Sequence, residues 1–263
     1  MKPHTGMFST KIWSKPGSWF ALGILSVAAF AIPPEVFAQH RLNIASGKQK
    51  VALLELYTSE GCSSCPPAES WIANLKHSER LWDEVVPVAF HVAYWDYLGW
   101  KDPFAEEQFS QRQRALAREA GSRVYTPGFF LDGQEWRGFF QRSLLPGPKS
   151  LSPGILSVQV SSRDQLQASF DGHKLNAPTL NIAILGFGKT SQVRAGENRG
   201  RKLHHDFVVL DFLRLPAQQT AKTWMADLSG LDLGTEKGTR AIAAWITEHN
   251  SYVPVQAAGG WIE

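Results

Sequence analysis

The first half of the chain contains two long apolar runs, and between them apolar residues recur at helical spacing. Residues 50–59 (KVALLELYTS) and 85–94 (VVPVAFHVAY) are continuous apolar runs that predict two buried strands. Between them, apolar residues recur at helical spacing over residues 68–75, which predicts a helix. Strand, helix and strand in this order predict a parallel βαβ unit with a right-handed crossover.

A second helix is predicted from an N-cap at Asp102 to a C-cap at Gly121. The segment PGFFLDGQEWRGF follows it and predicts a hairpin of two short strands with its turn at Asp132-Gly133. Residues 46–145 are therefore expected to form an α/β domain.

The pattern changes after a segment that is rich in proline, glycine and serine. This segment, residues 146–154, is predicted to be a linker. Beyond it, short runs of strand length follow one another, and none of them has the pattern of a long helix. Short strands joined by turns predict an all-β, sandwich-like domain over residues 155–263.

The first residues have the features of a secretory signal peptide. A region with three lysines precedes an apolar run over residues 19–32, and VFA ends at the predicted cleavage site after Ala38. Pro33-Pro34 stop the apolar run short of the roughly 20 residues that a membrane-spanning helix needs. We therefore expect a signal peptide over residues 1–38, and a periplasmic or secreted protein without a stable membrane anchor after cleavage.

Composition narrows the possible classes of function. The chain is 43% hydrophobic and 19% charged, which is typical of a folded globular protein. Its formal charge of +3 gives no strong preference for nucleic acid or membranes, and no nucleic-acid partner is expected. Export would place its two cysteines in an oxidising compartment, where disulfides persist.

Both cysteines lie in one short motif, GCSSCPP, between the first predicted strand and the first predicted helix. A helix N-terminus stabilises a thiolate, and the thiolate is the nucleophile in disulfide exchange. A second cysteine two residues further on can resolve the mixed disulfide. The motif therefore predicts a thiol–disulfide oxidoreductase with Cys62 as nucleophile and Cys65 as resolving thiol.

Two other functions stay open on the same residues. The cysteines could bind metal together with His91, in a periplasmic metal-binding protein or metallochaperone. They could instead form an inert structural disulfide in a non-catalytic binding protein. Pro66-Pro67 leave two helix starts open. A helix that begins earlier would carry the prolines in its first turn, whereas one that begins at Pro67 would leave Cys62 several residues from the helix end and weaken its activation.

Several separate motifs together resemble one bacterial family. They are LLELYTSEGCSSCPPAES, AFHVAYWDYLGWKDPF, QRQRALA, VYTPGFFLDG and VRAGENRGRKL. From about residue 51 to the C-terminus, the chain is similar to the secreted family called domain of unknown function twelve twenty-three. That family is placed among thioredoxin-like folds and has no settled biochemical role. The resemblance implies an α/β thioredoxin-like domain followed by an all-β sandwich-like domain.

Five further residues are candidates for supporting the cysteine pair. In thioredoxin-like proteins a cis proline before the third strand faces the cysteines, which assigns Thr126 and Pro127 to a substrate groove. Glu55, a charged residue in an apolar strand, is a candidate proton carrier. Trp95 belongs to an aromatic loop that could cover the pair, and His91 ends a buried strand as a core histidine or a ligand.

The expected function is that of an exported thiol–disulfide oxidoreductase. Its expected partners are protein or small-molecule thiols and disulfides, together with a redox partner that the sequence does not identify. No cofactor is expected.

Overall fold

The computed structural model describes residues 40–217, 222–236 and 238–263. The described residues form one compact unit. The predicted signal peptide, residues 1–38, lies outside the described residues. Within the described ranges, no helix has both the length and the apolar character that crossing a bilayer requires.

The helical elements are short. They are α1 (Pro66–Ala73), η1 (Asn74–His77), η2 (Ala93–Leu98), α2 (Glu107–Glu119) and α3 (Gly138–Gln141). The strands of the first half are β1 (His40–Ala45), β2 (Ala52–Thr58), β3 (Val85–Val92), β4 (Ala105–Glu106), β5 (Gly128–Leu131) and β6 (Gln134–Glu135). The strands of the second half are β7 (Gly154–Ser161), β8 (Gln165–Gly172), β9 (Thr179–Gly186), β10 (Lys189–Gln192), β11 (Lys202–His205), β12 (Val208–Pro216), β13 (Thr223–Asp227), β14 (Arg240–Thr247) and β15 (Pro254–Trp261).

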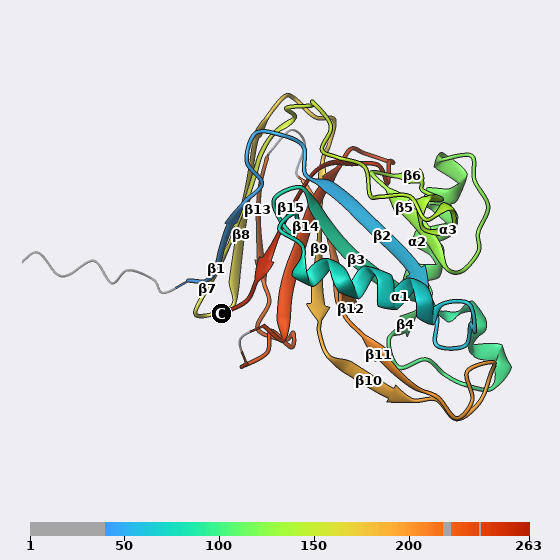
Figure 1. The fold of residues 1–263 in the computed structure, drawn as a ribbon. Helices are drawn as coiled ribbons and strands as arrows, with labels where there is room; N and C mark the ends of the chain where they lie inside the picture. The colour runs from blue at the N-terminus through green and yellow to red at the C-terminus, as the bar shows by residue number, and fades with distance from the viewer. Residues whose placement is uncertain (1–39, 218–221, 237) are drawn as a thin grey trace, which may run out of the picture. The chain divides into compact units, whose positions relative to one another are not determined.

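One nine-stranded sheet runs through the compact unit (Figure 1). Its strand order is β15-β14-β9-β12-β3-β2-β5-β6, and β4 pairs with β3 beside this path. A four-stranded sheet has the order β1-β7-β8-β13, and β10 and β11 form a separate two-stranded ribbon.

The centre of the large sheet joins the two halves of the chain. β2 and β3 are parallel, as the βαβ pattern predicts, with Ala52 paired to Val85 and Thr58 to His91. The other edge of β3 pairs with β12, where the Ala89 N–H donates to the carbonyl of Phe207 at 2.9 Å. Strands from before and after residues 146–154 therefore belong to one sheet.

The predicted fold class, an α/β thioredoxin-like domain followed by an all-β sandwich-like domain, is wrong. Of the described residues, 42% lie in strands and 16% in helices, and no thioredoxin-like α/β arrangement is present among them. The physical reason lies in β3, which is buried along its whole length. An exposed edge on so apolar a strand would invite aggregation, and β12 pairs with this edge at Ala89. The apolar run shows that β3 needs neighbours, but it does not identify them.

Side chains alternate between the two faces of the large sheet, so each face has its own hydrophobic core. On β14, Ile242, Ala244 and Ile246 belong to the core between the large sheet and the four-stranded sheet. Trp245 points the other way, toward Arg112 of α2.

Local predictions were right for the hairpin and wrong for one helix start. Asp132 and Gly133 have φ values of 52° and 77° between β5 and β6, as a tight hairpin turn requires. Helix α2 begins at Glu107, so Asp102 is not its N-cap. The Asp102 carboxylate instead accepts hydrogen bonds from the backbone N–H groups of Glu60 and Phe104.

A candidate disulfide site beside a buried histidine–carboxylate cluster

Cys62 and Cys65 form a disulfide in the loop between β2 and α1. Helix α1 begins at Pro66, and both prolines lie in its first turn. Prolines are tolerated there because the first N–H groups of a helix have no partner within it. The alternative in which the helix begins at Pro67 is therefore wrong.

The prolines also change what the helix start can offer to sulfur. Pro66 and Pro67 have no N–H, and the N–H groups of Ala68 and Glu69 both donate to the Cys65 carbonyl. The Cys62 sulfur lies 3.3 Å from the Ser64 hydroxyl oxygen. Stabilisation of a Cys62 thiolate would thus rest on a side chain more than on helix N–H groups.

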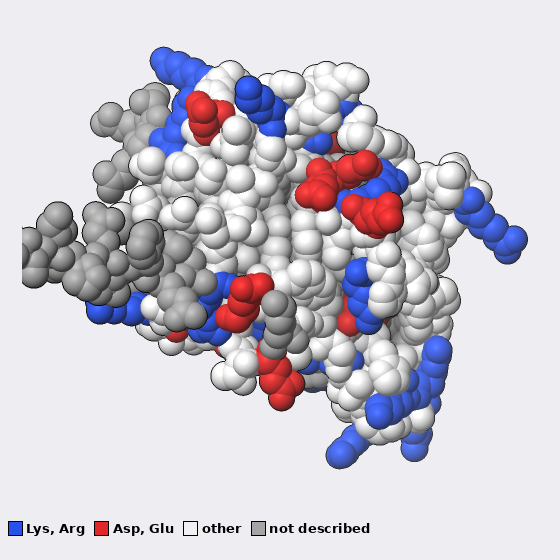
Figure 2. Space-filling view, turned by 60° about the vertical axis from the view of Figure 1, so that its left-hand side comes forward, with Lys and Arg blue, Asp and Glu red and all other residues white. Residues whose placement is uncertain are grey.

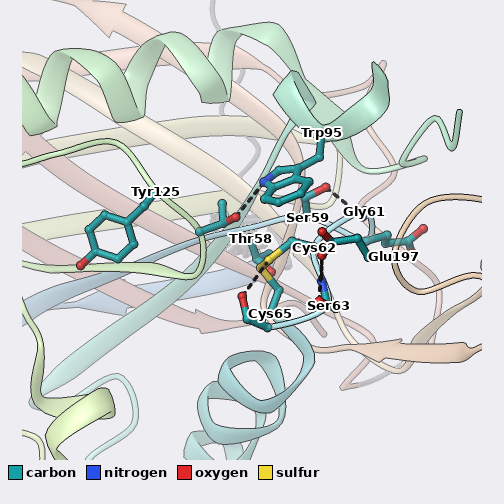
Figure 3. The surroundings of a disulfide bond; sticks show 12 residues. Thr58, Ser59, Gly61, Cys62, Ser63, Cys65, Trp95, Tyr125 and Glu197 are labelled. Carbon is teal, nitrogen blue, oxygen red and sulfur yellow. Dashed lines mark hydrogen bonds between the residues drawn. A yellow bond between two sulfur atoms is a disulfide. The ribbon is translucent and has the colours of Figure 1, made fainter. Parts of the chain in front are cut away.

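The two sulfurs are covered, whereas the residues between them are open to solvent. Cys62 and Cys65 are 1% and 0% exposed. Ser63 and Ser64 are both exposed. Figure 3 shows Trp95 on one side of the disulfide and Glu197, from the loop between β10 and β11, on another.

Side chains of the β10–β11 loop hold the cysteine loop directly. The buried Asn198 amide donates to the carbonyls of Cys62, at 2.9 Å, and Glu60, at 2.8 Å. The Glu197 carboxylate accepts from the Ser63 N–H at 2.8 Å and from the Ser63 hydroxyl at 2.7 Å. These bonds, made by residues more than a hundred positions away in sequence, fix the backbone on both sides of Cys62.

Trp95 is anchored to the predicted groove residues. Its Nε1 donates to the Thr126 hydroxyl oxygen at 2.8 Å. The Thr126–Pro127 peptide bond is cis, as expected. Gly61 lies against the tryptophan, where an added Cβ would be 3.0 Å from the Trp95 Cβ. The aromatic loop and the Thr126–Pro127 segment therefore meet beside the cysteine loop.

Glu55 does not join this group. Its carboxylate accepts from Arg112 Nε and from the Tyr57 hydroxyl, both at 2.8 Å, in a fully buried site. Glu55 and Thr58 are three residues apart on one strand, so their side chains point to opposite faces of the sheet. The candidate proton carrier thus lies on the α2 face, and Thr58 contacts α1.

His91 lies on the α1 face, next to Thr58 in the parallel register. Thr58 donates to the Glu69 carboxylate of α1 at 2.6 Å, and His205 of β11 contacts the same carboxylate. β2, β3, α1 and β11 thereby bring distant polar residues together. We call the resulting set the histidine–carboxylate cluster; its members are Glu60, Glu69, His91, Asp102 and His205, each at most 6% exposed.

Each histidine of the cluster is oriented by carboxylates. His91 Nδ1 lies 2.7 Å from Asp102 Oδ2. His205 Nε2 lies 2.9 Å from Glu60 Oε1, and its Nδ1 lies 2.5 Å from Glu69 Oε2. The ring centroids of the two histidines are 4.9 Å apart.

The cluster shifts the ionisation of its members. Burial disfavours the charged form of His205, but hydrogen bonds and charge from Glu60 and Glu69 outweigh burial and raise its pKa to about 10. Burial likewise opposes ionisation of Glu69 and Asp102. Contacts with His205 hold the pKa of Glu69 below its usual value, and contacts with His91 do the same for Asp102.

Sequence reasoning missed most of this cluster. It predicted Asp102 as a helix cap and named only His91 of the cluster as a possible ligand. Adjacent strand residues do point to opposite faces, and here His204 is exposed while His205 is buried. A buried partner for His205 could be found only once β11 was placed beside α1.

Most of the chain is similar to one known protein family. A family model described as "Protein of unknown function (DUF1223)" matches residues 53–247, which is most of the chain. The chain belongs to the DUF1223 family. The predicted family is thereby confirmed. The cysteine pair and the whole histidine–carboxylate cluster lie within the DUF1223 match.

Solved structures similar to this DUF1223 protein support its fold. A crystal structure of a protein from Agrobacterium tumefaciens has 22% identity and a TM-score of 0.56, covering 81% of this chain and 95% of that chain. The protein HBP35 of Porphyromonas gingivalis has 16% identity and a TM-score of 0.50, covering 81% of this chain and 75% of that chain. Comparison with curated proteins gives no match.

Proposed function

We propose that the protein is an exported thiol–disulfide oxidoreductase that works through Cys62 and Cys65. The observation that carries this proposal is the disulfide between these two residues, in the loop before α1 and under side chains that are held by hydrogen bonds. A disulfide that closes so short a loop removes little conformational entropy from the unfolded chain. Stabilisation alone is therefore a weak reason for its presence.

The exchange reaction balances with a partner dithiol as the reductant. A partner thiolate attacks the Cys62 sulfur, the bond to Cys65 breaks, and Cys65 leaves as a thiolate that takes up a proton. The partner's second thiolate then attacks the partner's first sulfur, which is bonded to Cys62 in the mixed disulfide. Cys62 is released as a thiolate and is also protonated. The partner dithiol is oxidised by two electrons, and the reverse sequence reduces a partner disulfide with Cys62 as nucleophile.

The side chains that cover the sulfurs, from the aromatic loop and the β10–β11 loop, would decide which partners react. Cys62 is 1% exposed, so an attacking thiolate reaches it only after the cover moves. Ser63 and Ser64 remain exposed and give a partner a first contact beside the sulfur. The face drawn in Figure 2 carries acidic and basic side chains in several places and a group of basic ones at its lower right, so no single charge covers it.

The test compares single-cysteine variants after reaction with oxidised glutathione. Cys65→Ser leaves Cys62 without its resolving thiol, so we expect a stable glutathione adduct on Cys62 that mass spectrometry detects. Cys62→Ser leaves only the fully buried Cys65, and we expect at least tenfold slower adduct formation. Ser70→Ala in the intact pair, at an exposed position of α1, is the matched control and should leave the native redox cycle working.

Two results would contradict the proposal. One is equal adduct formation by both single-cysteine variants. The other is a wild-type disulfide that resists millimolar dithiothreitol until the protein unfolds, which would identify an inert structural disulfide.

A further inference from the structure

The histidine–carboxylate cluster contains a group that the proposed redox chemistry does not use. One ligand atom each from Glu69, His91 and His205 lies within 4.8 Å of the other two. The three side chains come from α1, β3 and β11, and all are buried. Two imidazoles and one carboxylate form a ligand set that suits zinc in proteins.

His91 supplies an independent observation that points to a ligand. Its Nδ1 faces Asp102, but its buried Nε2 has no hydrogen-bond partner among the described residues. A buried polar atom without a partner is unfavourable, and such atoms in folded proteins need an explanation. A metal ion bound to Nε2 would satisfy this nitrogen.

The second histidine has the matching arrangement. His205 Nε2 faces Glu60, which leaves Nδ1 directed at Glu69. Histidines that bind metal almost always give their other ring nitrogen to a carboxylate or carbonyl, which fixes the ring and makes it a stronger donor. Asp102 serves His91 in this way, and Glu60 serves His205.

Distance and charge agree with a cation at this position. The ligand atoms of a tetrahedral zinc ion lie about 3.3 Å apart at ordinary bond lengths. The widest pair of the set would have to approach by at most about 1.5 Å, and His205 Nδ1 and Glu69 Oε2, now 2.5 Å apart, would have to separate by about 0.8 Å to admit the ion. With both imidazoles neutral, the three buried carboxylates of the cluster would carry excess negative charge, which a divalent cation offsets.

We propose that Glu69, His91 and His205 bind one divalent cation of the zinc class, with Asp102 and Glu60 orienting the two imidazoles. The ion would connect α1, β3 and β11 and stabilise the packing around the cysteine loop. The cysteines take no part, which separates this site from a metal clip made of Cys62, Cys65 and His91. This metal site thus lies outside the redox function and does not depend on it.

Zinc binding by the purified protein provides the test. After treatment with chelator, we expect one equivalent of Zn²⁺ to bind in calorimetry and to raise the melting temperature, while Mg²⁺ does neither. The double variant Cys62→Ser/Cys65→Ser should bind equally well. His91→Gln and His205→Gln should weaken binding at least 100-fold, and His204→Gln, next to His205 but exposed, is the matched control.

A second measurement covers the case in which a histidine variant does not fold. Co²⁺ added to the wild-type protein should give the visible bands of nitrogen and oxygen ligation, without a thiolate charge-transfer band. Asp102→Asn should weaken Zn²⁺ binding by about 10–100-fold, because it alters the orientation of His91 and removes no ligand. Failure of the folded wild type to bind Zn²⁺ stoichiometrically, or binding that requires the cysteines, would overturn the proposal.

Discussion

Two buried ionic clusters lie against opposite faces of the parallel strands β2 and β3. On the α2 face, Arg112 pairs with Glu55, and its guanidinium lies 5.1 Å from the ring centroid of Trp245 and 5.5 Å from that of Phe90. On the α1 face, the histidine–carboxylate cluster has two imidazoles in place of the guanidinium. Both clusters are closed to solvent, but they differ in the chemistry that they allow.

The difference lies in the cation. Burial lowers the tendency of Arg112 to hold its charge, but the charge of Glu55 outweighs burial and raises its pKa, so the guanidinium stays protonated. Its two terminal nitrogens have no hydrogen-bond partner among the described residues and face aromatic rings. An imidazole can lose its proton and bind a metal, whereas a guanidinium cannot. The α2 cluster therefore suits a structural role alone, whereas the imidazoles of the α1 cluster can also exchange a proton for a metal ion.

Removing the guanidinium should have the largest effect on stability. Arg112→Met leaves the Glu55 carboxylate buried without its cation, and we expect a loss of about 3–5 kcal/mol in the free energy of unfolding by urea. Adding Glu55→Gln keeps an acceptor for the Tyr57 hydroxyl and should recover most of the loss. Equal instability of the single and double variants would show that aromatic packing of Arg112, and not its charge, matters.

Removing His205 should have a smaller effect that depends on pH. In chelator, we expect His205→Gln to lower the free energy of unfolding by about 2–4 kcal/mol near pH 6, because Glu60 and Glu69 lose their shared partner. The raised pKa of about 10 means that the His205 contribution is complete below its unfolded value near 6.5 and is lost as pH rises through 10.

The acid side of this profile has the opposite sign. The lowered pKa of Glu69 means that its contribution is present above its unfolded value near 4.5 and is lost as pH falls below it. The loss of unfolding free energy caused by His205→Gln should therefore be greatest between about pH 5 and 6.5. The ionisable side chains of His91 and Asp102 also face this site. The loss caused by Arg112→Met should not decrease between pH 6.5 and 10. A His205→Gln penalty that stays level over that range would contradict the difference between the clusters.

The cover over the cysteines should show a smaller effect still. Asn198→Ala removes two hydrogen bonds to the cysteine loop, and we expect dithiothreitol to reduce the disulfide about 3–10-fold faster, from about 1 kcal/mol of easier local opening. Stopped-flow tryptophan fluorescence would follow the reaction. An unchanged rate in a folded variant would mean that the β10–β11 loop does not limit access.

The exposed contact of the same loop should matter least. Glu197→Gln keeps the shape of the side chain and weakens its bonds to Ser63, which are open to solvent. We expect less than a twofold increase in the same reduction rate, because exposed polar contacts contribute little. A larger increase than that of Asn198→Ala would reverse the order of the two contacts.

Local elements of the fold could be predicted because their causes are local. The apolar runs of β2 and β3, the helix after the cysteines and the turn at Asp132-Gly133 all depend on neighbouring residues. The spacing of the cysteines likewise allowed a disulfide between Cys62 and Cys65 to be expected. The start of α2 was mispredicted because the polar side chain of Asp102 has two uses, and only long-range packing gave it to His91 and Glu60.

The sequence by itself determined the buried strands β2 and β3, the hairpin at Asp132-Gly133, the cysteine motif and, through its motifs, the family. The tertiary structure alone decided that β12 lies beside β3, that Asn198 holds the Cys62 backbone, and that His205 meets His91 and Glu69. Spacing along a chain fixes which face a side chain takes within its own element. Which elements share a face depends on how edges and apolar surfaces are buried, and this is a property of the whole chain.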